Sequence, residues 1–480
     1  MTLKIEFLSN KKILIKLFIL LSFFLIAIFF GNRYLKLEDK VVLNNIKIQE
    51  LKDLSNTIKI KEQELKDLSN TIKIKENESL QLKLNRIFEN INEIKIFFEG
   101  EDSNFIDNKE IIIKKFNFYD FQIFDFDNVI NGRSYIDRYK SQLYIINEKG
   151  FLYSSDINNF FNNSNFKLNK IKSNIFQIIQ NKNFYLSNKL GIKDMIIHDG
   201  ELYISVSNFD ETLNCAKLNI YTGALNNSEI NFEKFWDSGE CVFQNNKHGE
   251  FDLWQTGGRM IINDENLFLS TGEYRNRDLA QNPDSIYGKL LMINMNNKEH
   301  KIIASGLRNP QGLYLDSINN SFYMSDHGPH GGDEINRLNF EPIDNNAIAN
   351  FGWPISSYGK HYPSDDVEEK YLKAPLYKSH SKYNFIEPLL HYIPSIAPSQ
   401  LIILNSKPNR LLIVSSMKGE LILYLIKENG KLEKFQSIKF DGKRLRDLYF
   451  DDSSKRLIIY NESDPGFITI NLSNIFSRAQ

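Results

Sequence analysis

The stretch SDHGPHGGDEINRL, residues 325–338, concentrates side chains that could do chemistry. It holds two histidines, three acidic residues and four glycines or prolines, a set that suits a metal site, a phosphate cradle or a tight turn between strands. His327 and His330 could ligate zinc or iron, but the sequence offers no clear third ligand. We expect Asp326 and Glu334 to form hydrogen bonds within the turn.

Chain length and charge limit the elements that could position such a site. With 480 residues, the chain can form one large all-β domain with an appendage. The formal net charge is −1, so no basic field exists to attract nucleic acid. We therefore expect no nucleic-acid partner.

The first 35 residues predict a membrane anchor. An apolar run over residues 13–31 is interrupted only by Lys16 and is just long enough to span a bilayer. No small-residue pair follows it, so we expect an anchor rather than a cleaved signal peptide, with a buried core helix as the alternative. The preceding lysines place the tip of residues 1–35 in the cytoplasm and the main domain in the periplasm or outside the cell.

A repeat behind the anchor predicts a stalk over residues 36–96. The sequence ELKDLSNTIKIKE occurs at 50–62 and again at 64–76, a period of two heptads. Leucine and isoleucine fall at the core positions of a short coiled coil, which would make a homo-oligomer through the stalk. A single solvated helix is the alternative.

Residues 97–480 change to short apolar runs separated by Gly, Asn and Asp, which predicts an all-β domain. Each run resembles a strand, a turn and a second strand. Because such units recur at uneven spacing without helical periodicity, we expect a β-propeller, with a double β-sandwich as the alternative. The units are residues 143–156, 194–208, 259–273, 312–328, 401–419 and 447–463.

The chain has two cysteines, Cys215 and Cys241. If the main domain lies outside the cytoplasm, a disulfide between them would close a loop of roughly 25 residues. Two free buried thiols are the alternative. Their number and spacing argue against a cysteine-ligated zinc site.

Three motifs together resemble the glucose/sorbosone dehydrogenase family. ASGLRNPQGLYLD at 304–316, the turn at 325–338 and NFGWP at 350–354 follow the family's order, and the resemblance covers roughly residues 195–450. It implies a six-bladed β-propeller that binds pyrroloquinoline quinone (PQQ) and Ca²⁺. It also implies oxidation of an aldose or a similar alcohol, with electrons passed to a respiratory acceptor.

The resemblance assigns five cofactor-binding residues. Because PQQ carries three carboxylates and an ortho-quinone, its site needs several fixed cations. Arg308 and Asn309 match the pair that contacts the quinone, and Lys418 matches the cofactor lysine. Arg444 and Arg446 match the carboxylate-binding arginines, and their alternate spacing places both on one face of a strand.

The resemblance also gives the turn at 325–338 a role. The main-chain carbonyls of Gly328 and Pro329 would ligate the calcium ion, since glycine and proline turn the chain tightly. Asp333 matches a family acid near the cofactor.

One position departs from the family. WQTGGRM places Gln255 where family enzymes carry the histidine that acts as general base, and glutamine cannot accept a proton near neutral pH. GEYRNRD places Glu273 where an aspartate orients that base, so Glu273 could serve as a substitute base, as could His248. Two functions stay open: a membrane-anchored PQQ-dependent sugar dehydrogenase, or a propeller that binds a sugar or protein partner without turnover.

Overall fold

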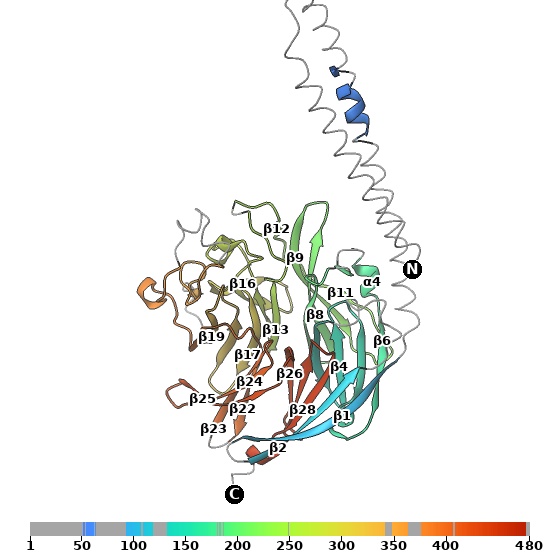
Figure 1. Cartoon of the computed structure of the whole chain (residues 1–480), viewed down its shortest axis with the longest axis vertical. Coiled ribbons are helices and arrows are strands. Elements are labelled where there is room, and N and C mark those ends of the chain that lie inside the picture. Colours follow the sequence, from blue (N-terminus) through green and yellow to red (C-terminus); the bar gives the residue numbers. More distant parts are fainter. Residues whose placement is uncertain are drawn as a thin grey trace, which may run out of the picture. The chain divides into compact units, whose positions relative to one another are not determined.

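The structure is a computed structural model in which the chain divides into two units, Met1–Asn85 and Arg86–Gln480 (Figure 1). The residues it describes are 51–63 except 53 and 62, 93–106, 109–118, and 132–476 except 180, 182–183, 186, 248, 341–347, 363–375 and 407–408. The predicted anchor, most of the predicted stalk and His248 lie outside the described residues.

The first unit is described only over part of one helix. Residues 51–52, 54–61 and 63 are helical, as the repeat predicts. The side chains of Leu51 and Leu54, expected in a coiled-coil core, are exposed, so that core would need a second copy of the chain and stays a prediction. Within the described part of the chain, no helix is long and apolar enough to cross a bilayer.

The second unit consists mainly of antiparallel strands in six consecutive groups, and the first three strands of each group pair in chain order, as the hairpin pattern predicts. The first strands of the six groups are β3 (Ser134–Tyr139), β7 (Gly191–His198), β13 (Gly257–Asn263), β17 (Pro310–Asp316), β22 (Pro398–Ser406) and β26 (Leu445–Asp451). The second strands are β4 (Gln142–Asn147), β8 (Glu201–Asp210), β14 (Asn266–Thr271), β18 (Ser321–Asp326), β23 (Asn409–Ser416) and β27 (Arg456–Asn461). The third strands are β5 (Leu152–Asp156), β9 (Cys215–Ala224), β15 (Leu290–Asn294), β19 (Asp333–Asn339), β24 (Glu420–Ile426) and β28 (Gly466–Asn471).

The outer strands and short elements complete the sheets. The outer strands are β6 (Phe166–Ser173), β11 (Glu233–Trp236), β16 (His300–Ser305), β21 (Leu390–Tyr392) and β25 (Leu432–Lys439), with β10 (Glu229–Ile230), β12 (Val242–Phe243) and β20 (Ala349–Asn350) as additions. The short helices are η2 (Ile157–Phe161), α4 (Ile175–Ile178), η3 (Arg277–Ala280), η4 (Ser381–Tyr383) and α7 (Ser473–Phe476).

Five of the predicted hairpins are the first two strands of a sheet, whereas residues 143–156 form β4 and β5. The turn between β7 and β8 shows why these runs fold back. Asp199 and Gly200 have φ angles of 49° and 79°, which Asp tolerates and Gly favours in a two-residue hairpin turn.

The first strands form the inner ring of the unit. Among the described residues, they contact one another in the order β3, β7, β13, β17, β22, β26 and back to β3. A closed ring of sheets is the arrangement of a propeller-like all-β fold, and it excludes the double β-sandwich.

A long hairpin joins the outer strands of the first and last sheets. β1 (Glu93–Ile106) pairs with β2 (Lys109–Phe118), β2 pairs with β28 of the last sheet, and β1 pairs with β6 of the first sheet. This hairpin begins at Glu93 rather than at the expected boundary of residue 97. The outer edges of the first and last sheets, at β6 and β28, are therefore paired.

Buried aspartates connect successive inner strands. Asp447 accepts the backbone N–H of Ile136 at 2.8 Å, and Asp194 accepts that of Met260 at 2.7 Å. Arg259 lies between these two carboxylates, with its Nη1 2.8 Å from Asp447 and 3.0 Å from Asp194. All three side chains line a cavity of about 340 Å³ to which each inner strand contributes. The centre of the ring is therefore charged but internally paired.

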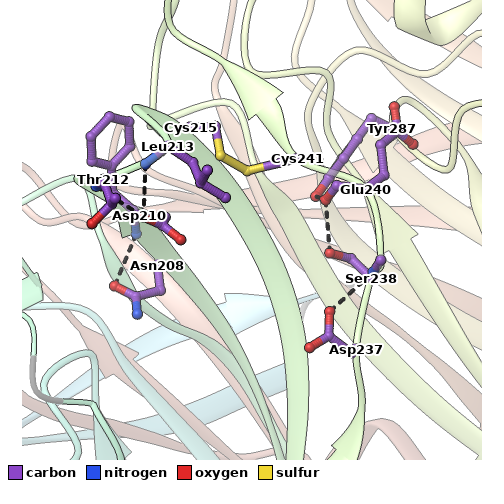
Figure 2. Close-up of a disulfide and its surroundings, with 12 residues drawn as sticks. Asn208, Asp210, Thr212, Leu213, Cys215, Asp237, Ser238, Glu240, Cys241 and Tyr287 are labelled. Carbon is purple, nitrogen blue, oxygen red and sulfur yellow. Dashed lines mark hydrogen bonds between the residues drawn. A yellow bond between two sulfur atoms is a disulfide. The ribbon is translucent and has the colours of Figure 1, made fainter.

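Cys215 and Cys241 form a disulfide with a Cα–Cα distance of 5.6 Å, which confirms the predicted pairing. Figure 2 shows the bond joining the start of β9 to the segment that precedes β12. The neighbouring Glu240 accepts hydrogen bonds from the Ser285 hydroxyl and the Ile286 N–H, both at 2.8 Å. The disulfide thus holds a loop that also packs on the next sheet.

Removing this disulfide is expected to lower stability without changing the fold. For a separation of 26 residues, the loss of chain-entropy restraint predicts a decrease of about 3 kcal/mol in the free energy of unfolding. The double variant Cys215→Ala, Cys241→Ala and the reduced wild-type chain should show similar decreases in denaturant titrations. Equal stability of the oxidised and reduced wild-type chains would contradict this prediction.

Candidate active site

Three segments at one end of neighbouring sheets bring Gln255, Glu273 and Arg308 together. Gln255 precedes β13, Glu273 follows β14 and Arg308 precedes β17. Backbone bonds fix the spacing, because Tyr274 N donates to Gln255 O at 2.8 Å and Glu273 N donates to Arg308 O at 3.1 Å. A Cβ at Gly272 would lie 2.4 Å from Gln255 O, so glycine is needed for this close approach.

The amide of Gln255 bridges the carboxyl group and the guanidinium. With the amide oriented by its partners, Nε2 donates to Glu273 Oε1 at 2.7 Å and Oε1 accepts from Arg308 Nη2 at 2.9 Å. The opposite orientation would set an amide donor against a guanidinium donor. Gln255 therefore holds both neighbours but cannot act as a base near neutral pH.

Glu273 is fully buried and carries a perturbed carboxyl group. Burial raises the pKa of Glu273 to about 8, although the positive charges of Arg308 and Arg277 oppose this shift. Among the described residues, Oε2 of Glu273 has no hydrogen-bond partner. The carboxyl group is therefore mostly protonated at neutral pH, with Oε2 as the atom free to carry the proton.

Two buried donors near this carboxyl group also lack partners. Arg308 Nε and Trp353 Nε1 have no acceptor within the described part of the chain. They lie close together, since the Arg308 guanidinium carbon is 5.3 Å from the centre of the Trp353 ring. Both residues line a cavity of about 10 Å³, room for about one water. Unpaired buried donors and an unpaired carboxyl oxygen are typical of a site that a ligand completes.

The aromatic residues of the NFGWP region are covered by other side chains. The Trp353 ring lies against two guanidiniums, those of Arg308 and of Arg277, the latter at 5.5 Å. Tyr358 stacks on His391 with ring centres 3.8 Å apart. Neither ring offers two open faces, so neither is a simple stacking platform for a sugar.

Asp326 holds the Arg308–Asn309 pair in place. Its carboxylate accepts the backbone N–H of Arg308 at 2.9 Å and that of Asn309 at 2.6 Å. Asn309 Oδ1 in turn accepts from Gly257 N at 3.2 Å, which connects this pair to the start of β13. The expectation that Asp326 bonds within its own turn is therefore wrong, because its partners belong to the segment before β17.

The turn at 325–338 holds the active-site arginine and a neighbouring segment. Arg308 Nη1 donates to the carbonyls of His327 and Gly328, at 3.0 and 2.8 Å. Asp333 accepts from Gly328 N at 3.0 Å and from Ala397 N at 2.7 Å, so its carboxylate connects two segments of backbone. Asp333 therefore acts as a structural acceptor here, although the resemblance places it near the cofactor.

These hydrogen bonds do not favour a calcium ion at the carbonyls of Gly328 and Pro329. A divalent cation at Gly328 O would lie beside the positive charge that already occupies this oxygen, that of Arg308. The predicted calcium site stays a prediction, and the residues as placed do not fit it.

The two histidines of this turn do not converge on a metal. His327 Nε2 lies 2.6 Å from Pro398 O, whereas the backbone of His330 pairs with Lys360. Within the described residues, no group of three or more histidine, cysteine, aspartate or glutamate side chains could hold a metal ion. Glu334 Oε2 accepts a hydrogen bond from Asn336 Nδ2 at 3.2 Å, within the stretch 325–338 as expected, and Glu334 Oε1 lies 3.2 Å from His380 Nε2, outside this stretch.

Two of the three remaining predicted cofactor residues, Arg444 and Arg446, pair with one carboxylate, that of Glu462. Arg446 binds it through Nε at 2.6 Å, and Arg444 Nε lies 3.5 Å away. Although burial opposes ionisation of Glu462, the charges of Arg446, Arg444 and Arg133 lower its pKa below the ordinary value. Lys418 Nζ donates to the carbonyl of Ser395. Positive charge exceeds negative charge at this end of the ring, as binding of an anionic ligand requires.

The family resemblance did not identify two residues of this site, Glu462 and Arg133. Glu462 lies in the hairpin at 447–463, and the motifs assign it no role. Arg133 lies before the region that resembles the family. Arg133 is buried and bound to Glu148 Oε2 at 2.5 Å. Arg133, Arg308 and Arg444 each lie one or two residues before an inner strand, and this shared position was the available signal.

Comparisons with known proteins agree with this geometry. The family model described as Glucose / Sorbosone dehydrogenase matches residues 162–469, well over half of the chain. The curated "Aldose sugar dehydrogenase YliI" of Escherichia coli (strain K12) is 25% identical over 237 residues, which cover 45% of this chain and 60% of that protein. "Uncharacterized protein slr1608" of Synechocystis sp. is 30% identical over 173 residues, covering 31% of this chain and 38% of that protein. The chain thus spans less than two thirds of these relatives.

Solved structures show the same fold. The apo form of the soluble aldose sugar dehydrogenase from Escherichia coli has a TM-score of 0.54 and 18% identity, covering 72% of this chain and 96% of that one. A crystal structure of a glucose dehydrogenase has the same TM-score with 17% identity, covering 71% of this chain and 97% of that one.

Proposed function

Because the chain belongs to the glucose/sorbosone dehydrogenase family, we propose that it is a PQQ-dependent dehydrogenase that oxidises an aldose or a similar alcohol. Each inner strand would then be the first strand of one blade in a six-bladed propeller. The chemistry would take place at the end of the ring where Gln255, Glu273 and Arg308 meet.

The observation that carries this proposal is the carboxyl group of Glu273. It is buried, its Oε2 has no partner among the described residues, and burial raises its pKa to about 8. A group whose pKa lies near the working pH can both take and return a proton. Family enzymes use a histidine for this step, and Glu273 is the titratable group that contacts the position of that histidine.

The cationic residues support PQQ as the cofactor. Arg444, Arg446 and Lys418 would hold its carboxylates, and Arg308 with Asn309 would hold its quinone end. Bound PQQ would supply a two-electron acceptor for the hydrogen removed from the alcohol carbon.

The chain's own residues then have separate tasks. Glu273 accepts the hydroxyl proton of the substrate at Oε2. Gln255 donates to Oε1, which keeps Oε2 in place. The unpaired Nε of Arg308 is available as a donor to an oxygen of the ligand.

A second function is favoured by one observation. The Gln255 oxygen accepts from Arg308, the Gln255 nitrogen donates to Glu273, and Glu273 is fully buried. Such a site could bind a sugar or a protein partner without turnover, because the group that faces the ligand cannot accept a proton.

The deciding experiment uses the full-length chain in mild detergent. PQQ binding is measured by calorimetry, and turnover is followed by dye reduction with a panel of aldoses and alcohols. We expect binding and turnover. Binding without turnover, with activity gained in Gln255→His, would instead support the binding protein.

We further propose that the chain is anchored in the membrane by residues 13–31, with the main domain in the periplasm or outside the cell. The disulfide Cys215–Cys241 supports an oxidising compartment. Electrons would pass to a respiratory acceptor, and the stalk would pair copies of the chain. Alkaline extraction of membranes should leave the chain in the pellet, and release into the supernatant would contradict the anchor.

A further inference from the structure

Among the described residues of the main domain, three lysines are buried, Lys149, Lys193 and Lys289, and Lys193 differs from the other two. Lys149 Nζ donates to three carbonyls, as does Lys289 Nζ. Each of these ammonium groups is therefore saturated by protein oxygens. Lys193 Nζ donates to one carbonyl, that of Lys189, at 2.6 Å. Within the described residues, it has no carboxylate at ion-pair distance, so two of its three donors have no acceptor there.

Lys193 lies between the two halves of the proposed cofactor site. It belongs to β7, which neighbours β3 on one side and β13 on the other. A Cβ at Gly258 would lie 2.3 Å from Lys193 Cβ, so the lysine packs against the start of β13, three residues after Gln255. On the other side, the charges that act on it include Arg133 and Arg446.

The charges around Lys193 are predominantly positive. Arg133, Lys149 and Arg446 act on it from neighbouring elements, with Glu148 as the opposing carboxylate. Glu148 is itself bound to Arg133, at 2.5 Å, and Glu462 is bound to Arg446. Burial first, and then these cations, lower the pKa of Lys193 well below its ordinary value. An anion placed beside Lys193 would reverse this effect.

We propose that Lys193 binds a carboxylate of the cofactor and takes up a proton from solvent as the anion enters. This inference rests on the proposed function, and it adds a residue that the family motifs do not assign. Arg133 and Lys193 extend the anion site from the last sheet, with Arg444 and Arg446, to the first two sheets. Burial and the surrounding cations favour the neutral amine in the empty site, and a bound carboxylate would favour the ammonium form, so proton uptake would accompany binding of the anion.

The test measures proton uptake when PQQ binds to the full-length chain. Calorimetric titrations in two buffers with different ionisation enthalpies give the number of protons taken up. We expect uptake approaching about one proton per PQQ at pH values between the free and the bound pKa of Lys193. Trimesate, a simple tricarboxylate, serves as a second probe of the anion site alone.

Two variants separate binding from folding. Lys193→Met keeps the volume of the side chain and should abolish the uptake and weaken PQQ binding by about tenfold to a hundredfold. Lys193→Arg keeps the positive charge but cannot lose it, so it should bind PQQ without uptake. Lys189→Met is the matched control, because Lys189 is half-exposed and pairs with Asp252, and it should keep the uptake.

The outcomes are distinguishable. Wild-type affinity and uptake in a folded Lys193→Met variant would overturn the inference. Uptake with trimesate, lost in Lys193→Met, but no binding of PQQ would keep the anion site and overturn the proposed cofactor. Binding of neither probe would overturn both.

Discussion

Glu273→Gln is expected to lower kcat/KM by a factor of about 10² to 10⁴, the usual contribution of a general base. The substitution keeps the size of the side chain and the hydrogen bond to Gln255 but removes the atom that would accept the proton. PQQ affinity should change little, because the cofactor carboxylates are held elsewhere. The measurement is steady-state dye reduction together with calorimetric PQQ binding.

The pH dependence gives an independent readout of the same residue. Because burial raises the pKa of Glu273 to about 8, the active carboxylate is scarce below that pH. Wild-type kcat/KM should rise as pH increases through about 8 and then level off. The same shift means that the folded state binds the Glu273 proton more tightly than the unfolded state. The contribution of Glu273 to the free energy of unfolding therefore falls as pH rises from the ordinary glutamate pKa to about 8.

Two controls make the Glu273 prediction specific. Glu240→Gln changes a carboxylate that holds Ser285 and Ile286 in another part of the domain, and it should leave turnover unchanged. Gln255→His restores the residue that family enzymes carry at this position. Full activity in Glu273→Gln would rule out Glu273 as the base.

Arg259→Met is expected to cost about 3–5 kcal/mol of folding free energy, the range for removing one partner of a buried ion pair. Arg259 lies between Asp194 and Asp447 and also donates to the carbonyls of Gln311 and Arg446, at 2.8 and 3.1 Å. Without it, two buried carboxylates would face each other unpaired. Denaturant titration of the purified variant measures the loss.

The pH dependence of this loss has a definite sign. Burial raises the pKa of Asp194 to about 7 even with Arg259 present, and removal of the arginine should raise it further. Arg259→Met should therefore be least destabilising in acid and more so as pH rises through about 7. Combining Arg259→Met with Asp194→Asn and Asp447→Asn should recover part of the stability. No recovery would mean that lost packing, rather than unpaired charge, causes the effect.

The sequence predicted the architecture better than the details of the site. The alternation of apolar runs and turn residues identified the hairpins, because each unit of this fold repeats the same local pattern. The family motifs also identified Gln255, Glu273 and Arg308, which the fold brings into contact. The motifs succeeded because they include residues from separate segments that become neighbours in the folded domain.

Lys193 shows what the sequence could not provide. In a regular strand, alternation would fix which way Lys193 points relative to Asp194, but the pairing of β7 with β8 shifts register between Ile192 and Asp194. Such a bulge changes the face on which a side chain lies and leaves no clear mark in the sequence. Asp333 shows a second such gap, because the motif did not indicate that its carboxylate accepts the backbone N–H groups of Gly328 and Ala397.

The β1–β2 hairpin also determines when the domain can complete its folding during synthesis. β2 is made early, but its partner β28 lies at Gly466–Asn471, close to the end of the chain. The ring cannot close until nearly all of the polypeptide has left the ribosome, and a pairing over such a separation in sequence forms slowly. If the main domain is exported unfolded, as its proposed location requires, this delay keeps the β2–β28 pairing from forming before export is almost complete.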